Sequence, residues 1–185
     1  MNSPTKTGST STFSPHKLPD LASTLGKFLA SRGIEAYIVG GAVRDAVLDR
    51  ETRDIDVAVV ADAQGVGNEI ASRLGGRLVL LDEARDIVRV VVGGSQGAPR
   101  VDITSIRDGI LSDLKRRDFT VDAMALSREH WCSPDWQQHI LDPFGGRKDI
   151  QGRLLRAVSD SVFVDDPVRM LRVVRLSAGL AFHID

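Results

Sequence analysis

The sequence predicts an α+β fold, in which a small mixed β-sheet carries flanking helices and is followed by the start of an all-helical segment. Short apolar runs bounded by glycine or charged residues indicate the strands. Between them, apolar residues that recur every three or four positions indicate amphipathic helices. The chain of 185 residues, 42% hydrophobic and 26% charged, has the size and composition of one globular domain, or of one domain and a fragment of another.

The first half of the chain alternates helical and strand-like segments. Apolar residues at helical spacing predict a first helix from Leu21 that Gly33 ends, and a later helix that Gly75 closes. The other expected elements are, in order, a strand over residues 36–39, a helix over 42–48, a strand over 55–60, the later helix over 66–74, and strands over 78–81, 87–92 and 101–104, the last two joined by a hairpin loop over 93–99.

From Ser112 onward the spacing is helical, with Phe119, Val121 and Met124 as expected core contacts. The last predicted helix covers residues 167–179. It has no evident partner in the sequence, so we expect the polypeptide to continue in the natural protein. The expected division is a disordered Ser-, Thr- and Pro-rich tail over 1–18, a main domain over 19–148 and the start of a helical domain over 149–185.

Composition narrows the classes of function. The net charge is −1, so a long RNA would have to be held by a local basic patch or by residues outside this chain. The one cysteine, Cys132, excludes an intramolecular disulfide and fits a reducing cytoplasm. No apolar run reaches the length of a membrane span, and the N-terminus lacks the apolar stretch of a secretory signal. The oligomeric state is not indicated.

Asp54 and Asp56 are the most informative pair of residues in the chain. Side chains alternate along a strand, so both carboxylates point to the same face, and the apolar residues around them indicate a buried strand. Buried like charges need compensation, and an oxygen-coordinated Mg²⁺ supplies it. Asp102 lies in another predicted strand; if the two strands adjoin, three carboxylates can hold two metals. The alternatives are two solvated aspartates and, for Asp102, an exposed strand residue.

Gly40 and Gly41 follow a predicted strand and precede a helix. Such a turn presents backbone N–H groups and a helix N-terminus to an anion, which predicts a phosphate site beside the acids. A phosphate site beside a metal site indicates an enzyme that acts on a nucleoside triphosphate. Arg44 can hold phosphate oxygens with two hydrogen bonds. In the alternative interpretation, Arg44 and Asp45 are exposed helix residues.

Two further clusters carry charge. Lys115, Arg116 and Arg117 are consecutive and point in different directions on a helix, so we expect one cation to face the interior, and choose Arg117 for the triphosphate. In the second cluster, Asp166 and Arg169 have the types and spacing to read a base edge. A carboxylate accepts from the exocyclic amino group of adenine or cytosine. The alternative is an ordinary helix start, with Asp166 as N-cap and a solvated arginine stripe.

Together these motifs resemble the bacterial class II tRNA nucleotidyltransferase and poly(A) polymerase family. Four segments carry the resemblance, in the family's order: residues 39–45, 54–56, 116–123 and 165–172. The resemblance covers about residues 37–182. It implies a head domain with the DNA polymerase beta nucleotidyltransferase fold and the first helices of a neck, whereas the helical body and tail that bind tRNA in family members are absent.

The resemblance also implies roles for single residues. Asp54, Asp56 and Asp102 are the implied catalytic acids and Mg²⁺ ligands. The family's phosphate, ribose and base motifs fall on the implied nucleotide-binding set: Gly40, Gly41, Arg44, Asp45, Arg117, Asp118, Asp122, Asp166, Arg169 and Arg172.

Two departures from the family pattern stand out. Asp122 replaces the usual Asn, and a carboxylate only accepts hydrogen bonds where an amide also donates. The loop over residues 108–112 is short, as in relatives that add only part of the CCA end.

The sequence thus predicts a template-independent enzyme that adds CMP or AMP, or both, from CTP and ATP to the tRNA 3′ end. The addition of CCA, CC or A alone stays open. The alternatives are a poly(A) polymerase with the same head and, from another class, a catalytically idle nucleotide- or RNA-binding module.

Overall fold

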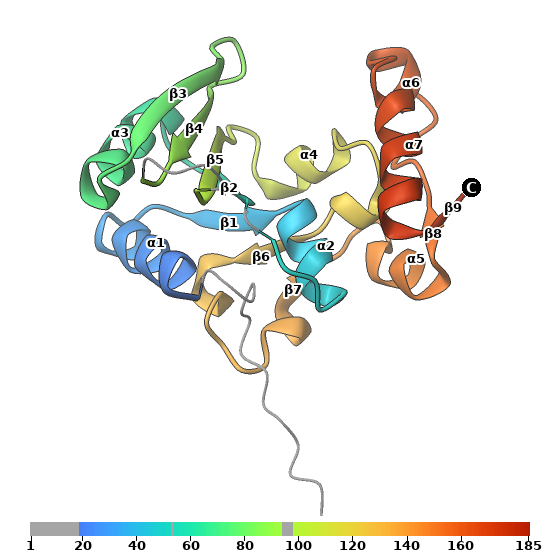
Figure 1. Cartoon of the computed structure of the whole chain (residues 1–185), viewed down its shortest axis with the longest axis horizontal. Coiled ribbons are helices and arrows are strands. Elements are labelled where there is room, and N and C mark those ends of the chain that lie inside the picture. Colours follow the sequence, from blue (N-terminus) through green and yellow to red (C-terminus); the bar gives the residue numbers. More distant parts are fainter. Residues whose placement is uncertain (1–18, 53, 94–97) are drawn as a thin grey trace, which may run out of the picture.

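The computed structural model describes residues 19–52, 54–93 and 98–185, and in them a seven-stranded mixed sheet of order β3-β4-β5-β2-β1-β6-β7 (Figure 1). β2 and β5 are parallel, and the other neighbours are antiparallel. The predicted fold class is confirmed. The strands are β1 (Ala36–Val39), β2 (Asp54–Val59), β3 (Arg77–Asp82), β4 (Ile87–Val91), β5 (Arg100–Ser105), β6 (Ala125–Ser127) and β7 (Ile140–Leu141).

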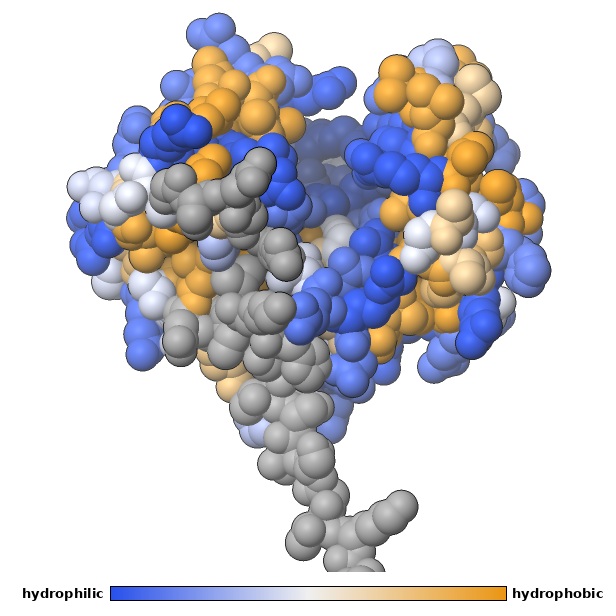
Figure 2. All heavy atoms as spheres, in the orientation of Figure 1, coloured by the Kyte–Doolittle hydropathy of each residue, from blue (hydrophilic) through white to orange (hydrophobic). Residues whose placement is uncertain are grey.

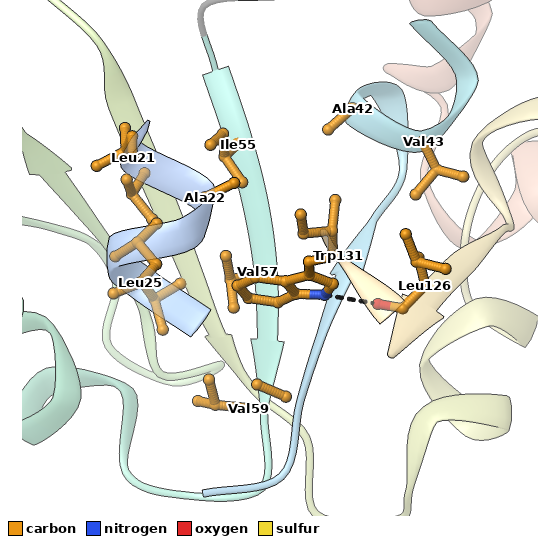
Figure 3. Packing of buried hydrophobic residues seen from close by; sticks show 14 of the residues in the cluster. Leu21, Ala22, Leu25, Ala42, Val43, Ile55, Val57, Val59, Leu126 and Trp131 are labelled. Carbon is orange, nitrogen blue, oxygen red and sulfur yellow. Dashed lines mark hydrogen bonds between the residues drawn. The ribbon is translucent and has the colours of Figure 1, made fainter. Parts of the chain in front are cut away.

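Two helices cover one face of this sheet. They are α1 (Pro19–Ser31) and α3 (Ala63–Leu74), and their apolar residues pack on alternate residues of β2 such as Ile55 and Val57. α3 begins where the Asp62 carboxylate accepts a hydrogen bond from Gly65 N–H and ends at the left-handed Gly75. Trp131 fills the centre of this core and donates a 2.9 Å hydrogen bond to the Leu126 carbonyl (Figure 3).

The opposite face is only partly covered. A smaller apolar cluster there joins Val39 and Ala58 of the sheet to Ile110 and Leu114 of α4 (Ile110–Lys115). Because side chains alternate, Asp54 and Asp56 share this face with Ala58, and they lie beyond the edge of the apolar cluster. α2 (Gly41–Val47) starts directly after the end of β1, and its Ala42 and Val43 pack into the larger core with α1 and α3. The acids of the sheet lie next to the first residues of α2 and the segment that follows α4.

The C-terminal segment forms an upright limb beside this open face (Figure 1). Its elements are α5 (Gly146–Gly152), α6 (Val162–Asp165), α7 (Arg169–Leu180) and a two-stranded parallel pair, β8 (Leu154–Leu155) with β9 (His183–Ile184). The outer face of α6 and α7 is apolar and exposed: Val164 is 82% and Leu171 73% exposed. The expected boundary after residue 148 falls inside α5, and the division into domains stays a prediction.

Most predicted elements up to residue 110 are confirmed, several to within one residue at each end. Strands β4 and β5 pair as an antiparallel hairpin, although residues 94–97 of its predicted loop lie outside the described residues, as does the predicted tail over 1–18.

The prediction of helical structure from Ser112 onward is wrong beyond Lys115, where α4 ends. The expected core contacts Phe119, Val121 and Met124 are indeed buried, but around a 3-10 helix, η1 (Thr120–Asp122), rather than an α-helix. The chain then adds β6 and β7 and two short 3-10 helices, η2 (Arg128–His130) and η3 (Trp136–His139). Conversely, part of the expected loop over 108–112 belongs to α4. Within the described residues, the helices are too short or too polar to cross a membrane.

Candidate active site

The three predicted acids lie on two adjacent strands of one sheet face. Asp56 of β2 is directly opposite Asp102 of β5 in the parallel register, and Asp54 lies two residues before Asp56 on the same face. The condition that the two strands adjoin is therefore met. The acids line a cavity of about 510 Å³, which is seen as a hydrophilic recess between the β3–β5 strands and the α6–α7 limb (Figure 2).

Asp56 is the central acid, and its charge is poorly compensated. Burial raises its pKa to about 6; the charge of Arg117 opposes the rise, and those of Asp102, Asp122 and Asp54 add to it. Among the described residues, no side chain donates a hydrogen bond to this carboxylate. A buried acid without a donor is the electrostatic setting that a bound cation relieves.

Asp54 and Asp102 differ from Asp56 because each is held by an arginine. Arg100 donates to both oxygens of Asp54, at 2.7 and 2.6 Å. Arg89 of β4 donates to both oxygens of Asp102, at 2.7 and 2.7 Å. The sequence reasoning missed both arginines. The alternation of β5 offered a signal for Arg100, which lies two residues before Asp102 and so on the same face.

The glycine turn is built as the sequence predicts. Gly40 has φ 68° and ψ −137°, a conformation that residues with a side chain avoid. A Cβ on Gly40 would lie 2.5 Å from Arg117 Nη1 and 3.2 Å from Asp56 Oδ2. The missing side chain therefore lets the turn approach both the cation and the central acid. α2 follows directly, at Gly41.

Arg44 is buried, so the interpretation of it as an exposed helix residue is wrong. Its Nε lies 2.9 Å from Asp45 Oδ1, and its Nη1 lies 2.5 Å from Asp122 Oδ1. Burial lowers the pKa of Arg44, and the charges of Asp122 and Asp45 more than offset this, so the guanidinium stays charged. Burial likewise raises the pKa of Asp122, and Arg44 opposes that rise. Asp122, the departure from the family pattern, is thus the partner of Arg44.

Arg117 is the inward-facing cation of its run, as predicted. Its guanidinium donates to Asp113 Oδ2 at 3.1 and 3.0 Å and lines the cavity, whereas Arg116 is largely exposed. The next residue, Asp118, is buried; it accepts from Phe119 N–H at 3.1 Å and from Arg172 Nε at 2.5 Å. This last bond ties the end of the α4 region to α7.

Asp166 and Arg169 face the same cavity from the start of α7. Asp166 Oδ1 accepts from Val168 N–H at 3.1 Å, and Asp166 Oδ2 lies 3.7 Å from Arg169 Nε. α7 itself begins at Arg169 rather than at residue 167, with Val168 as its N-cap. The carboxylate therefore makes a turn-type backbone bond, as the helix-start interpretation expects, and also lies beside the arginine with which it was predicted to act.

One cavity thus gathers segments that are far apart in the sequence. It is lined by all of the predicted site residues except Gly40, which lies directly behind it; beyond the predicted set, Thr52, Arg116 and Arg175 also contribute. The sheet side of the cavity is acidic, and the sides formed by the segment after α4 and by α7 carry arginines.

The donor set fits a divalent cation. Carboxylate oxygens are the ligands that hard cations prefer, and Asp54, Asp56 and Asp102 share one face. In the described residues no three acid, His or Cys side chains converge closely enough to hold a metal, and Asp54 and Asp102 are instead paired with Arg100 and Arg89. A metal site at these acids would require Asp54 and Asp102 to leave their arginines.

Comparison with known proteins agrees with this geometry. The family model of the poly A polymerase head domain matches residues 36–110 and 95–156. The CC-adding tRNA nucleotidyltransferase of Geobacter sulfurreducens is 40% identical over 168 residues, which are 90% of this chain and 36% of that relative. The chain therefore spans little more than a third of the length of this relative.

Solved structures give the same result. The Thermotoga maritima CCA-adding enzyme complexed with tRNA has a TM-score of 0.77 and 33% identity over 92% of this chain and 40% of that one. A CCA-adding enzyme complexed with CTP also has a TM-score of 0.77 and 33% identity, over 94% of this chain and 41% of that one. The chain belongs to the poly(A) polymerase head-domain family, in which its relatives are tRNA nucleotidyltransferases.

Proposed function

We propose that the chain is the catalytic part of a template-independent RNA nucleotidyltransferase that adds CMP or AMP, or both, from CTP and ATP to the 3′ end of tRNA in the cytoplasm. The observation that carries the proposal is the register of Asp56 with Asp102, beside the Gly40 turn and Arg117, in one cavity. The names of the related proteins support tRNA as the acceptor.

In this proposal the acids hold the metal. A nucleotidyltransferase family implies a divalent metal, and we assign Mg²⁺ to Asp54, Asp56 and Asp102 because their ligand atoms are all carboxylate oxygens. Bound there, the metal would activate the attacking 3′-hydroxyl and stabilise the leaving pyrophosphate. The central position of Asp56, and the absence of a hydrogen-bond donor to it among the described residues, make it the indispensable ligand of the three in this proposal.

The arginines and the glycine turn hold the triphosphate. Arg117 lies against Gly40 and faces the cavity, so its charge meets an anion that enters between α2 and α4. Arg44 remains charged in a buried place and positions the first turn of α2 through Asp122. Both cations are fixed by acids before any ligand arrives, so little reorganisation is needed when the phosphates bind.

The start of α7 selects the base. Asp166 offers an acceptor to the exocyclic amino group that adenine and cytosine share, and Arg169 beside it offers donors. Arg169 also donates to the backbone carbonyls of Arg116, at 3.0 Å, and Val162, at 3.3 Å, which fixes its place at the cavity edge. The limb that carries this pair corresponds to the proposed start of the neck, over residues 149–185.

The test uses the complete natural protein with a tRNA transcript that lacks its CCA end and with an unstructured RNA of equal length. Mg²⁺-dependent incorporation of CMP or AMP at the tRNA end supports the proposal, and the product lengths distinguish CC, A and CCA addition. Long poly(A) products on both RNAs would instead show a poly(A) polymerase. The absence of any incorporation, with nucleotide binding retained, would show an idle binding module.

The 185-residue chain alone serves as a second test. We expect it to bind nucleotide with metal and to extend tRNA poorly at physiological salt, because its net charge of −1 gives few phosphate contacts. Efficient extension by this chain would contradict the assignment of RNA binding to segments outside it.

A further inference from the structure

Arg89 and Arg100 stand out because the proposed function does not use them. Both point to the acid face of the sheet: Arg89 is paired with Asp102 between β4 and β5, and Arg100 with Asp54 between β5 and β2. Each makes a bidentate contact with the carboxylate opposite it. Thus both outer acids of the proposed metal site are already occupied by a cation that belongs to the protein.

We propose that Arg89 and Arg100 are latches that compete with the divalent metal for Asp102 and Asp54, so that metal binding releases both guanidinium groups toward the RNA phosphates. The proposal rests on the proposed function, since it takes the three acids as the metal site. It adds two positioning residues that exchange one partner, a carboxylate, for another.

The geometry makes the competition direct. An arginine in a bidentate contact uses both oxygens of its carboxylate, in the plane where a metal would also bind. Asp56, which has no donor among the described residues, is then the first ligand open to the cation. The metal would bind first at Asp56 and draw Asp54 and Asp102 away from their arginines.

The two latches should differ in strength. The side chains of Arg100 and Asp54 are both 44% exposed, whereas those of Arg89 and Asp102 are 31% and 20% exposed. Exposed ion pairs contribute little because water screens them, and partly buried pairs contribute more. The Arg89–Asp102 pair is therefore the stronger competitor, and its removal should increase metal affinity more.

The released arginines would lie where an RNA strand can use them. Across the sheet, Arg100 is followed by Val91 and Arg77, and Asp102 by Arg89 and Val79, so this face carries no further acid in these two rows of strand partners. A guanidinium that leaves its carboxylate remains next to the site and is free to pair with a phosphodiester. Metal and RNA would then favour each other's binding, as linkage requires.

The test is a titration of the 185-residue chain with Mn²⁺, in which electron paramagnetic resonance counts the free ion. We expect Arg89→Gln to raise Mn²⁺ affinity roughly tenfold and Arg100→Gln about two- to fivefold. Arg89→Lys and Arg100→Lys keep the charge but lose the bidentate contact, so each should raise the Mn²⁺ affinity by an intermediate amount. Arg77→Gln is the matched control: it removes a cation from the same face that has no acid partner among the described residues, and should leave the affinity within twofold.

The outcomes separate the two ideas. If Asp56→Asn does not weaken Mn²⁺ binding, the acids are not the metal site and the proposed function loses its metal assignment. If Asp56→Asn abolishes binding but the Gln and Lys variants of Arg89 and Arg100 bind as the wild type does, the latch is wrong and the proposed function stands. The latch would also be wrong if all Gln variants, Arg77→Gln included, bound Mn²⁺ more tightly while the Lys variants did not. Net charge alone would then explain the change in affinity.

Discussion

The guanidinium of Arg44 lies 2.5 Å from the carboxylate of Asp122, a residue 78 positions later, and both side chains are buried. The contact joins the helix that follows the glycine turn to η1. It also explains how the buried acid Asp122 is tolerated: the buried negative charge has a buried positive partner.

We expect Asp122→Ala to lower the free energy of unfolding by about 3 kcal/mol, since removal of one partner leaves a buried charge with less compensation. Asp122→Asn should cost only about 1 kcal/mol, because the amide oxygen still accepts from Arg44 and Asp45 still balances the charge. Urea unfolding followed by tryptophan fluorescence measures both. Asp160→Ala, at an exposed acid, is the control; a loss no larger than the control's for Asp122→Ala would contradict the stabilising role of the pair.

Gly40→Ala should abolish nucleotide transfer in the complete protein. The new Cβ would displace the Arg117 guanidinium, 2.5 Å away, as well as strain a backbone with φ 68°. Gly33→Ala provides the matched control, since Gly33 has φ 66° but nothing lies within 4 Å of the added Cβ. Gly33→Ala should cost about 1 kcal/mol of stability, and Gly40→Ala should cost more because Gly40 combines ψ −137° with close contacts, so the two activities are compared under conditions where both variants are folded. Equal activities of the two would show that the close approach at Gly40 is unimportant.

Asp54→Ala and Asp56→Ala should each reduce transfer by several orders of magnitude in the complete protein, because the metal that these acids are proposed to hold would act on both the attacking and the leaving oxygen. Loss of the Asp54 carboxylate should change stability by less than about 1 kcal/mol, as its ion pair with Arg100 is exposed. Single-turnover incorporation and thermal unfolding, measured on the same samples, test this. Retention of most activity in either variant would overturn the metal assignment.

Asp56 should also make stability depend on pH. Burial raises its pKa to about 6, above the value of 3.8 expected in the unfolded chain. Between these values the folded state binds more protons than the unfolded state, so the contribution of Asp56 to stability falls as pH rises from about 3.8 to 6. The free energy of unfolding of Asp56→Asn minus that of the wild type, measured without metal, should therefore increase as pH rises through this range. A pH-independent difference would contradict the raised pKa.

Base choice is best tested at Asp166. Arg169→Ala also removes bonds to two backbone carbonyls, so it loosens α7 as well as the site. Asp166→Asn keeps an acceptor for Val168 N–H and adds a donor. We expect discrimination against UTP and GTP to weaken by about 1–3 kcal/mol, measured as incorporation ratios for the four nucleotides in the complete protein. Unchanged ratios would leave Asp166 with only its turn-forming role.

Local patterns carried much of the prediction. β1 is a short apolar run, β2 begins with alternating acidic and apolar residues, and α3 has both its cap and its terminal glycine in the sequence. The segment after Ser112 was misjudged because β6 is three residues long and gains its strand conformation by pairing with β1, which no local pattern reveals. The buried residues of the segment after Ser112 follow spacings that fit a helix equally well.

The candidate site likewise combines features that could be predicted from the sequence with features that could not. Asp54, Asp56 and the glycine turn could be predicted because spacing along one segment fixes their geometry. The partners of the charged residues could not. Arg44 with Asp122 and Arg89 with Asp102 depend on which elements lie side by side, so sequence spacing is silent about both pairs.

The parallel pairing of β2 with β5 has a consequence for how this chain can vary. The two strands are neighbours in the sheet, yet α3, β3 and β4 intervene in sequence as an excursion that leaves the sheet centre and returns to it. Insertions or deletions within the turns of that excursion would change its outline but leave the Asp56–Asp102 register untouched, because the hydrogen-bonded ladder alone sets the spacing of the two acids. The spacing of the two acids is thereby independent of the length of the segment that separates them in sequence.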